Sequence, residues 1–328
     1  MAPYNGVFLL EKFFMKSKEI LSVIDKYINQ YKAEENPKYE TKYRIPSSDV
    51  SMLGPDFIRD DKSRVFFCFY RLSPEQYDNG EAQSFADAFF INGDSLKDGK
   101  IKLELNINMP VRVEGNEVFV DRSMMAELIT HELTHAYRKS KELAAGHYKS
   151  EFSLLDFITR RKKANKKYNM NERTKAYIRT MPNPNSDSNI YEKMKWVGYT
   201  LVEDEMFANI SGAEAFFASG GKIKDSRGKQ QVDIIKKYLD FIEKNATPED
   251  WKKCMNEISY ISTRKNETPD RFGKRWVSYY RDRISKFYEK LDRLKDKYSN
   301  NTKTDKFKVG FYKLAQSNNK KMIGRERD

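Results

Sequence analysis

The pattern of apolar and polar residues predicts strands in the first half of the chain and mainly helices after it. At residues 101–108 every second residue is Ile or Leu and the others are polar or charged, which predicts a half-buried strand that Pro110 ends. The apolar and aromatic run at 64–72 predicts a buried strand. A turn and a further short strand are expected within 113–120.

Helices are predicted where apolar residues recur at helical spacing. The first covers residues 8–33, and a short helix is expected at 82–91. A longer helix is predicted at about 122–143, where either Asp121 or Ser123 can cap the first turn. This helix follows the predicted strands directly along the chain.

The last third of the chain is predicted to be helical. A helix through 201–219 ends at the glycine pair that begins with Gly220. Two later helices share one start, TPED at Thr247 and TPDR at Thr268, with Thr as the cap, Pro at the first helical position and an acid in the first turn. The second of these is expected to run to about Tyr298.

These elements favour an α+β fold in three parts. Residues 1–62 are expected to form an N-terminal helix and a linker, because 34–62 is polar and interrupted by proline and glycine. Residues 63–221 are expected to form the core, with a basic, loop-rich insertion at 144–200. Residues 222–328 are expected to form a basic helical region.

The composition argues against three classes of protein: membrane-spanning, secreted and disulfide-rich. No run of eighteen apolar residues occurs, so no membrane span is predicted. The first apolar stretch is broken by Glu11 and Lys12, which does not fit a signal peptide. Cys68 and Cys254 are too few for a disulfide framework. A reducing setting is therefore expected, either cytoplasmic or virion-associated.

The net charge of +13 is the strongest bias in the composition. It includes the dense basic run RRKKANKK at 160–167. Such charge either covers a solvated surface or attracts an acidic partner or a nucleic acid. No zinc finger, aromatic RNA motif or glycine-rich phosphate loop accompanies it, so sequence-specific recognition of nucleic acid is not predicted.

The stretch HELTH at 131–135 contains the candidate metal ligands and a candidate catalytic residue. On a helix, His131 and His135 lie one turn apart on one face, so both imidazoles can bind a single metal ion such as Zn²⁺. Glu132 projects about 100° around the helix from His131, beside the ion rather than on it. From there it can act as a general base on water. The chain has only 3 histidines in 328 residues, which argues against a chance pairing.

Three residues are alternatives for the third ligand. Glu205 shares a helical face with Ala208 and Gly212, two small residues that would let their helix pack closely against the motif helix. Glu203 lies about 200° around the same helix, so the two glutamates cannot both bind one ion. His147 is the third histidine and would need a special turn to reach the site.

The HELTHAY motif, behind an alternating strand and ahead of a helix with glutamates, resembles the zincin metallopeptidases. Within them it is similar to the gluzincins, the thermolysin-like class, over roughly residues 95–220. The metzincin pattern does not fit, because Arg138 and Lys141 stand where that class has Gly and His. The resemblance implies a zincin-like core and peptide-bond hydrolysis, with Glu205 as the favoured third ligand and Glu132 as the base.

The resemblance also implies roles around the ion. The strand before the motif helix, 102–108, would be an edge strand that pairs with a peptide or protein substrate. Asn209, where thermolysin-like enzymes have Asp, would accept a hydrogen bond from a ligand histidine. Apart from the resemblance, the oxyanion needs a donor, and Tyr199 is preferred over Tyr137, Arg138 and His147 because it lies just ahead of the helix with the glutamates.

Two other functions remain open from the sequence. Roughly half of the chain lies outside the metallopeptidase-like region, which also fits a structural or assembly component of a large complex such as a phage virion. The positive charge also fits a nucleic-acid-associated protein with a structural zinc, whose binding would weaken steeply with salt.

Overall fold

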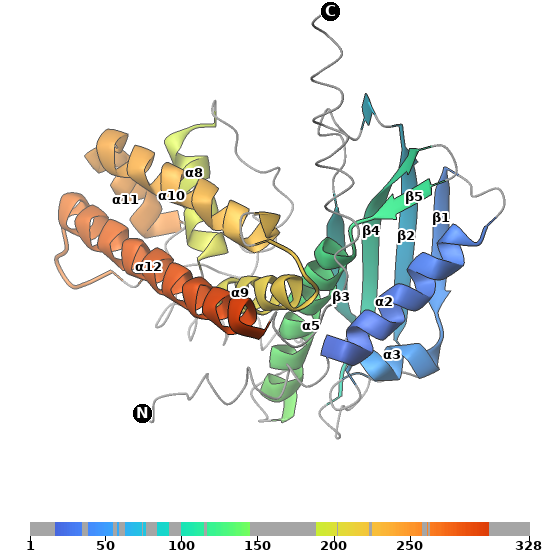
Figure 1. Ribbon diagram of the computed structural model, residues 1–328. Helices are drawn as coiled ribbons and strands as arrows, with labels where there is room; N and C mark the ends of the chain where they lie inside the picture. The colour runs from blue at the N-terminus through green and yellow to red at the C-terminus, as the bar shows by residue number, and fades with distance from the viewer. Residues whose placement is uncertain are drawn as a thin grey trace, which may run out of the picture.

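The computed structural model is an α+β fold with a mixed sheet on one side and a group of helices on the other (Figure 1). It describes residues 17–34, 39–54, 58, 63–73, 75–76, 84–91, 100–114, 117–144, 188–201, 203–222, 225–257, 261 and 263–301. Within these residues no helix has the length and apolar character needed to cross a membrane.

The sheet has five strands, and β4 is at its centre. The order is β1-β2-β4-β3, and β5 also pairs with β4. The pairing of β2 with β4 is parallel, and the other pairs are antiparallel. The strands are β1 (Glu40–Ile45), β2 (Arg64–Leu72), β3 (Phe85–Ile91), β4 (Lys102–Glu114) and β5 (Glu117–Val120).

The three predicted strands are confirmed as β2, β4 and β5, but β4 is longer than expected. It continues through Pro110 to Glu114, although Pro110 was predicted to end it. On one edge β4 pairs with β3 up to Asn108 and with β5 from Val111. Pro110 therefore lies between two antiparallel ladders, where a missing N–H is tolerated.

The helix predicted at 82–91 is wrong, because this segment forms strand β3. A short apolar run fits either structure locally, and pairing along β4 from Phe85 to Ile91 decides between them. The pairing with β3 also changes the expected position of β4 within the sheet. With β2 on one side and β3 on the other, β4 is an inner strand, so the prediction that 102–108 forms the edge is also wrong.

The segment 34–62 was predicted to be a linker, but it contributes to the fold. It contains β1, which pairs with β2, and helix α3 (Ser47–Leu53). Ile58 forms a bridge with Ile101 at the start of β4. The predicted N-terminal helix is confirmed as α2 (Ser17–Lys32), and residues 8–16 lie outside the described part of the chain.

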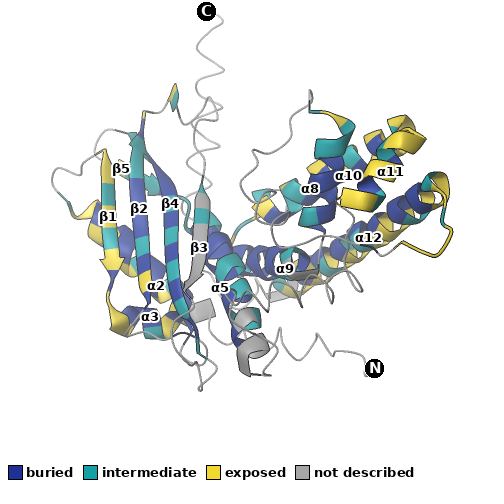
Figure 2. Cartoon of the chain, turned by 180° about the vertical axis from the view of Figure 1, so that it is seen from behind, coloured by how far each residue is buried: buried dark blue, intermediate teal, exposed yellow. Residues whose placement is uncertain are grey.

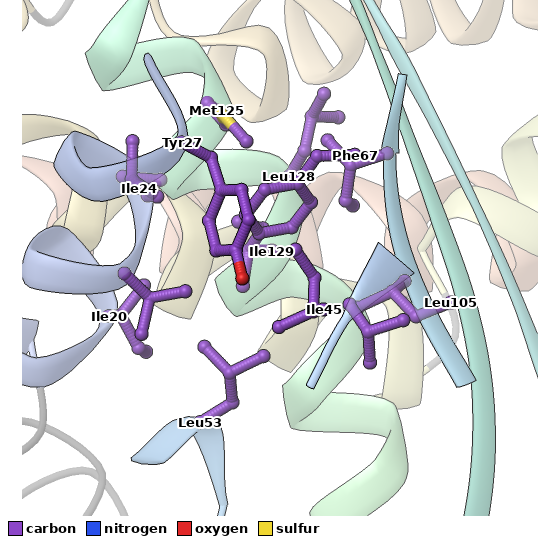
Figure 3. Close-up of a cluster of buried hydrophobic side chains, with 14 of the residues drawn as sticks. Ile20, Ile24, Tyr27, Ile45, Leu53, Phe67, Leu105, Met125, Leu128 and Ile129 are labelled. Atoms are coloured by element: carbon purple, nitrogen blue, oxygen red, sulfur yellow. The ribbon is translucent and has the colours of Figure 1, made fainter. Parts of the chain in front are cut away.

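A first hydrophobic core lies between the sheet and helices α2, α3 and α5 (Arg122–Ala144). Figure 3 shows side chains from all of these elements packed against one another. The labelled members are Ile20, Ile24, Tyr27, Ile45, Leu53, Phe67, Leu105, Met125, Leu128 and Ile129.

A second hydrophobic core is formed by helices alone. The aromatic residues Phe272, Trp276 and Phe287 of the last helix are fully buried or nearly so in it. The helices are α8 (Ile190–Thr200), α9 (Glu203–Ala218), α10 (Arg227–Asn245), α11 (Pro248–Glu257) and α12 (Pro269–Asn301).

The predicted helix starts of this second part are confirmed. Thr247 Oγ accepts from the backbone N–H of Asp250 at 3.2 Å, and Thr268 Oγ accepts from that of Arg271 at 3.4 Å. Helix α8 begins with a capping box at Asn189, inside the predicted insertion. The remainder of that insertion, 145–187, lies outside the described residues.

Helix α9 joins the two halves of the molecule. It contacts α5 on one side and α10 and α12 on the other. Figure 2 shows it as buried along most of its length, whereas the outer faces of α10, α11 and α12 are exposed. The contact between α5 and α9 therefore lies between the two hydrophobic cores.

Candidate metal centre

Helix α5 presents the HELTH stretch in a fixed orientation. Its first turn is capped by Asp121, whose Oδ1 accepts from the backbone N–H of Met124 at 2.9 Å, as predicted for one of the two alternatives. Met125, Ile129 and Leu133 are fully buried and lie in the first core. This packing fixes the rotation of the helix about its axis.

Helix α9 comes very close to α5 at Gly212. A Cβ atom at this position would lie 2.9 Å from the backbone oxygen of Glu127 and 3.5 Å from Cβ of His131. Real Cβ atoms do not approach a backbone oxygen so closely, so the contact requires glycine. The prediction that small residues allow close packing here is confirmed, and Ala208 is also fully buried.

His131, His135 and Glu205 converge on one point. The two Nε2 atoms are 3.2 Å apart, and each is 3.6 Å from Oε2 of Glu205. The side chains of the three residues are 21%, 18% and 12% exposed, so the group is reachable from solvent without being on an open surface. The structure thus brings together the two histidines and the glutamate favoured from the sequence.

The spacing of these three atoms fits a tetrahedral metal ion. Zinc ligands at roughly 2.0–2.1 Å and tetrahedral angles place neighbouring donor atoms roughly 3.3–3.4 Å apart. The observed separations of 3.2 and 3.6 Å lie on either side of this value. Two imidazole nitrogens and a carboxylate oxygen also form a donor set that suits zinc. The residues present therefore fit the metal.

The electrostatics of Glu205 match a ligand role. Burial alone would raise the pKa of its carboxyl group, but the imidazoles of His135 and His131 hold that pKa well below its usual range. Glu205 is therefore a charged carboxylate next to two nitrogen atoms, which is the form that binds a cation.

Glu132 lies beside the three converging residues without being one of them. Burial raises the pKa of its carboxyl group, while the imidazoles of His131 and His135 act in the opposite direction. The residue is half-buried. Its orientation beside the ion, about 100° around the helix from His131, stays a prediction from helix geometry.

Glu127 is a part of the site region that the sequence did not indicate. It lies one turn before His131 on α5 and is 3% exposed. Its carboxylate accepts from Ser226 Oγ at 2.8 Å and from the backbone N–H groups of Arg227 at 3.0 Å and Gly228 at 2.8 Å. It therefore accepts hydrogen bonds from donors at the start of α10. These donors lie 99 to 101 residues further along the chain.

Arg227 was also missed. It is the first residue of α10, and its side chain is exposed. Its positive charge acts on both carboxyl groups, lowering the pKa of Glu127 and of Glu132 against the larger effect of burial. No local pattern in the sequence indicates this arrangement, because Arg227 meets α5 only in the folded chain.

Three further residues were predicted as members of the site or as alternatives for it. Tyr199 lies on α8 in contact with the second core, where its ring meets Trp196 edge-on with centroids 6.0 Å apart, and its predicted role stays a prediction. Glu203 begins α9, but its side chain and all of His147 lie outside what the structure describes.

Asn209 is buried on α9, beside the start of α10. A Cβ atom on Gly228 would lie 3.0 Å from the backbone oxygen of Asn209 and 3.3 Å from its Cβ. Its Nδ2 is buried and has no hydrogen-bond partner within the described ranges. A hydrogen bond between Asn209 and a ligand histidine therefore stays a prediction.

Comparison with protein-family models, with curated proteins and with solved structures finds no match to this chain. The function has to be inferred from the residues and their geometry. The strongest feature in that respect is the convergence of two imidazoles and one carboxylate on a single point.

Proposed function

We propose that the protein is a zinc-dependent peptidase with a zincin-like core. His131, His135 and Glu205 hold the metal, and Glu132 is the general base. One observation carries the proposal. Three donor atoms from two helices lie at the mutual distances that a tetrahedral ion requires, and a further carboxylate adjoins them.

The division of roles follows from the positions of the two glutamates. A zinc ion held at this point would act as a Lewis acid and lower the pKa of water. Glu132 is next to the ligand histidines but is not itself a metal ligand. Its carboxylate therefore accepts the proton that the attacking water loses. It then donates that proton to the nitrogen of the leaving amine. Glu205 stays a carboxylate throughout, because its role is to bind the ion.

The number of ligands favours catalysis over a purely structural site. In the described part of the chain three residues converge, whereas structural zinc sites are closed by four. Catalytic zinc sites combine three protein ligands with an open position. The same feature counts against a nucleic-acid-associated protein in which zinc only stabilises the fold.

Strand β3 is the part of the sheet best placed to bind an extended peptide. It is the last strand in the order β1-β2-β4-β3, and it contacts α5. One of its edges pairs with β4, and no strand among the described residues pairs with the other. An extended peptide can add to such an edge through main-chain hydrogen bonds. β3 thus takes the role that the sequence assigned to 102–108.

The proposal is tested by comparing wild type with Glu132→Gln for zinc content and for cleavage of a broad fluorogenic peptide library. Both proteins should hold about one zinc per chain, and only wild type should cleave, because the substitution removes a base and not a ligand. Glu249→Gln is the matched control, since that side chain is 82% exposed on α11.

Two results would overturn the proposal. Equal cleavage by Glu132→Gln and wild type would remove Glu132 from the mechanism. A wild type that holds zinc and cleaves nothing in the library would favour a role in assembly of a larger complex.

A further inference from the structure

Glu127 is a buried carboxylate where α5, α9 and α10 meet. It lies on α5 one turn before His131 and is 3% exposed. Its Oε1 accepts from the backbone N–H of Gly228 and from Ser226 Oγ, both at 2.8 Å. Its Oε2 accepts from the backbone N–H of Arg227 at 3.0 Å. A buried charge is costly unless it is paired, and the start of α10 provides the pairing, so Glu127 fixes the position of that helix start.

The start of α10 in turn packs against the part of α9 that carries Glu205. A Cβ atom on Gly228 would lie 3.0 Å from the backbone oxygen of Asn209 and 3.3 Å from its Cβ. The same atom would lie 3.4 Å from Oε1 of Glu127. Asn209 lies one turn after Glu205, on the same face of α9. A shift of the start of α10 would therefore also shift Glu205.

These contacts close a ring that includes the candidate metal centre. From His131, one turn of α5 leads back to Glu127, whose carboxylate accepts a hydrogen bond from Gly228. Gly228 packs closely against Asn209. One turn of α9 leads from Asn209 back to Glu205, whose Oε2 is 3.6 Å from Nε2 of His131. Each link is a helical turn or a close contact, so a change at Glu127 reaches Glu205.

We propose that Glu127 is a positioning residue for the metal centre, which acts through α10 to hold Glu205 at ligand distance from the two histidines. The inference rests on the metal site of the proposed function and adds a residue to it. The contact at Gly212 sets the distance between α5 and α9. The carboxylate of Glu127 adds a second tie, which resists rotation of α9 about that contact.

The substitution Glu127→Gln tests this role, because an amide cannot replace the carboxylate. Both oxygens accept from backbone N–H groups, so either orientation of the amide places its NH₂ group against such a donor. Two properties of the metal centre are measured. One is the dissociation constant for Zn²⁺, by competition with a chromogenic chelator. The other is the visible absorption of the Co²⁺-loaded protein, which depends on the geometry of the ligands and not on the stability of the fold.

We expect Glu127→Gln to weaken zinc binding by about 10- to 100-fold, the range typical for loss of a residue that orients a ligand, and to change the Co²⁺ spectrum. Glu214→Gln is the matched control. Glu214 is also a buried carboxylate, on α9, with a side chain that is 4% exposed and a hydrogen bond of 2.8 Å from Lys297 of α12. This variant should lose stability in urea and keep the zinc affinity and the spectrum of wild type.

The substitution Gly228→Ala interrupts the same ring at another contact and leaves the carboxylate intact. The backbone of Gly228 lies outside the left-handed region, so alanine causes no backbone strain there. The added methyl group presses on the backbone of Asn209. Zinc binding should therefore weaken by about tenfold, the lower end of the same range. This variant decides the question if Glu127→Gln does not fold.

The inference and the function fail in different ways. If Glu127→Gln folds and binds zinc as wild type does, or if Glu214→Gln weakens zinc binding equally, the positioning role is wrong and the peptidase proposal remains. If Glu127→Gln does not fold, wild-type affinity in Gly228→Ala has the same meaning. If wild type binds zinc and cleaves nothing, but Glu127→Gln alone weakens the binding, the positioning role is supported and only the catalytic proposal fails. A wild type that binds neither ion overturns both.

Discussion

At the scale of single residues, the site depends on which side chains of α5 and α9 reach one point. His131 and His135 do so because they are one helical turn apart. Glu205 does so because its face of α9 is the one that turns toward α5, where Gly212 allows the close approach. Its neighbour Glu203 lies about 200° around the helix and would point away.

Replacing Glu205 with Gln should strongly weaken zinc binding. An amide is a poor zinc ligand, so the loss should exceed the roughly 10- to 100-fold that removal of an outer-shell partner costs. Glu203→Gln is the matched control and should change the affinity little. The measurement is the zinc retained after dialysis against a mild chelator. If Glu203→Gln loses the metal and Glu205→Gln keeps it, the assignment of the third ligand is wrong.

At the scale of elements, the contact between α5 and α9 sets the geometry of the centre. Glycine costs a helix roughly 1 kcal/mol relative to alanine, so Gly212 is there for the contact and not for the helix. A methyl group at this position would lie 2.9 Å from the backbone oxygen of Glu127. Space for it can be made only by moving α9 away from α5.

The substitution Gly212→Ala should therefore destabilise the protein by about 1–3 kcal/mol, despite the better helix propensity of alanine. Because the movement takes Glu205 away from the histidines, zinc affinity should fall as well. Urea unfolding with and without zinc measures both effects. If Gly212→Ala is as stable as wild type and binds zinc equally well, the close contact does not position the ligand.

The elements also show which parts of the fold could be predicted from the sequence and which could not. Strand β2 and the starts of α11 and α12 were predictable, because a run of apolar and aromatic residues and a capping sequence are local signals. Strand β3 was mistaken for a helix, since a short apolar run fits both structures and its pairing with β4 decides. That pairing also makes β3, and not 102–108, the end strand of the order to which we propose that a peptide binds.

At the scale of the whole molecule, the candidate centre lies between two hydrophobic cores. The motif helix belongs mainly to the core with the sheet, and α9 mainly to the helical core. The convergence of His131, His135 and Glu205 was predictable because each residue lies in a recognisable helix. The contact of Glu127 with α10 and the place of Arg227 were not, because they join residues about 100 positions apart.

The most direct test of the account is X-ray absorption at the zinc edge on the purified protein with one zinc per chain. Two imidazole nitrogens and oxygen should be found at roughly 2.0–2.1 Å, with no sulfur, because neither Cys68 nor Cys254 belongs to the converging group. His135→Ala should lose one imidazole contribution or the metal itself. A protein that takes up no zinc, or a first shell with sulfur at about 2.3 Å, would contradict the central claim.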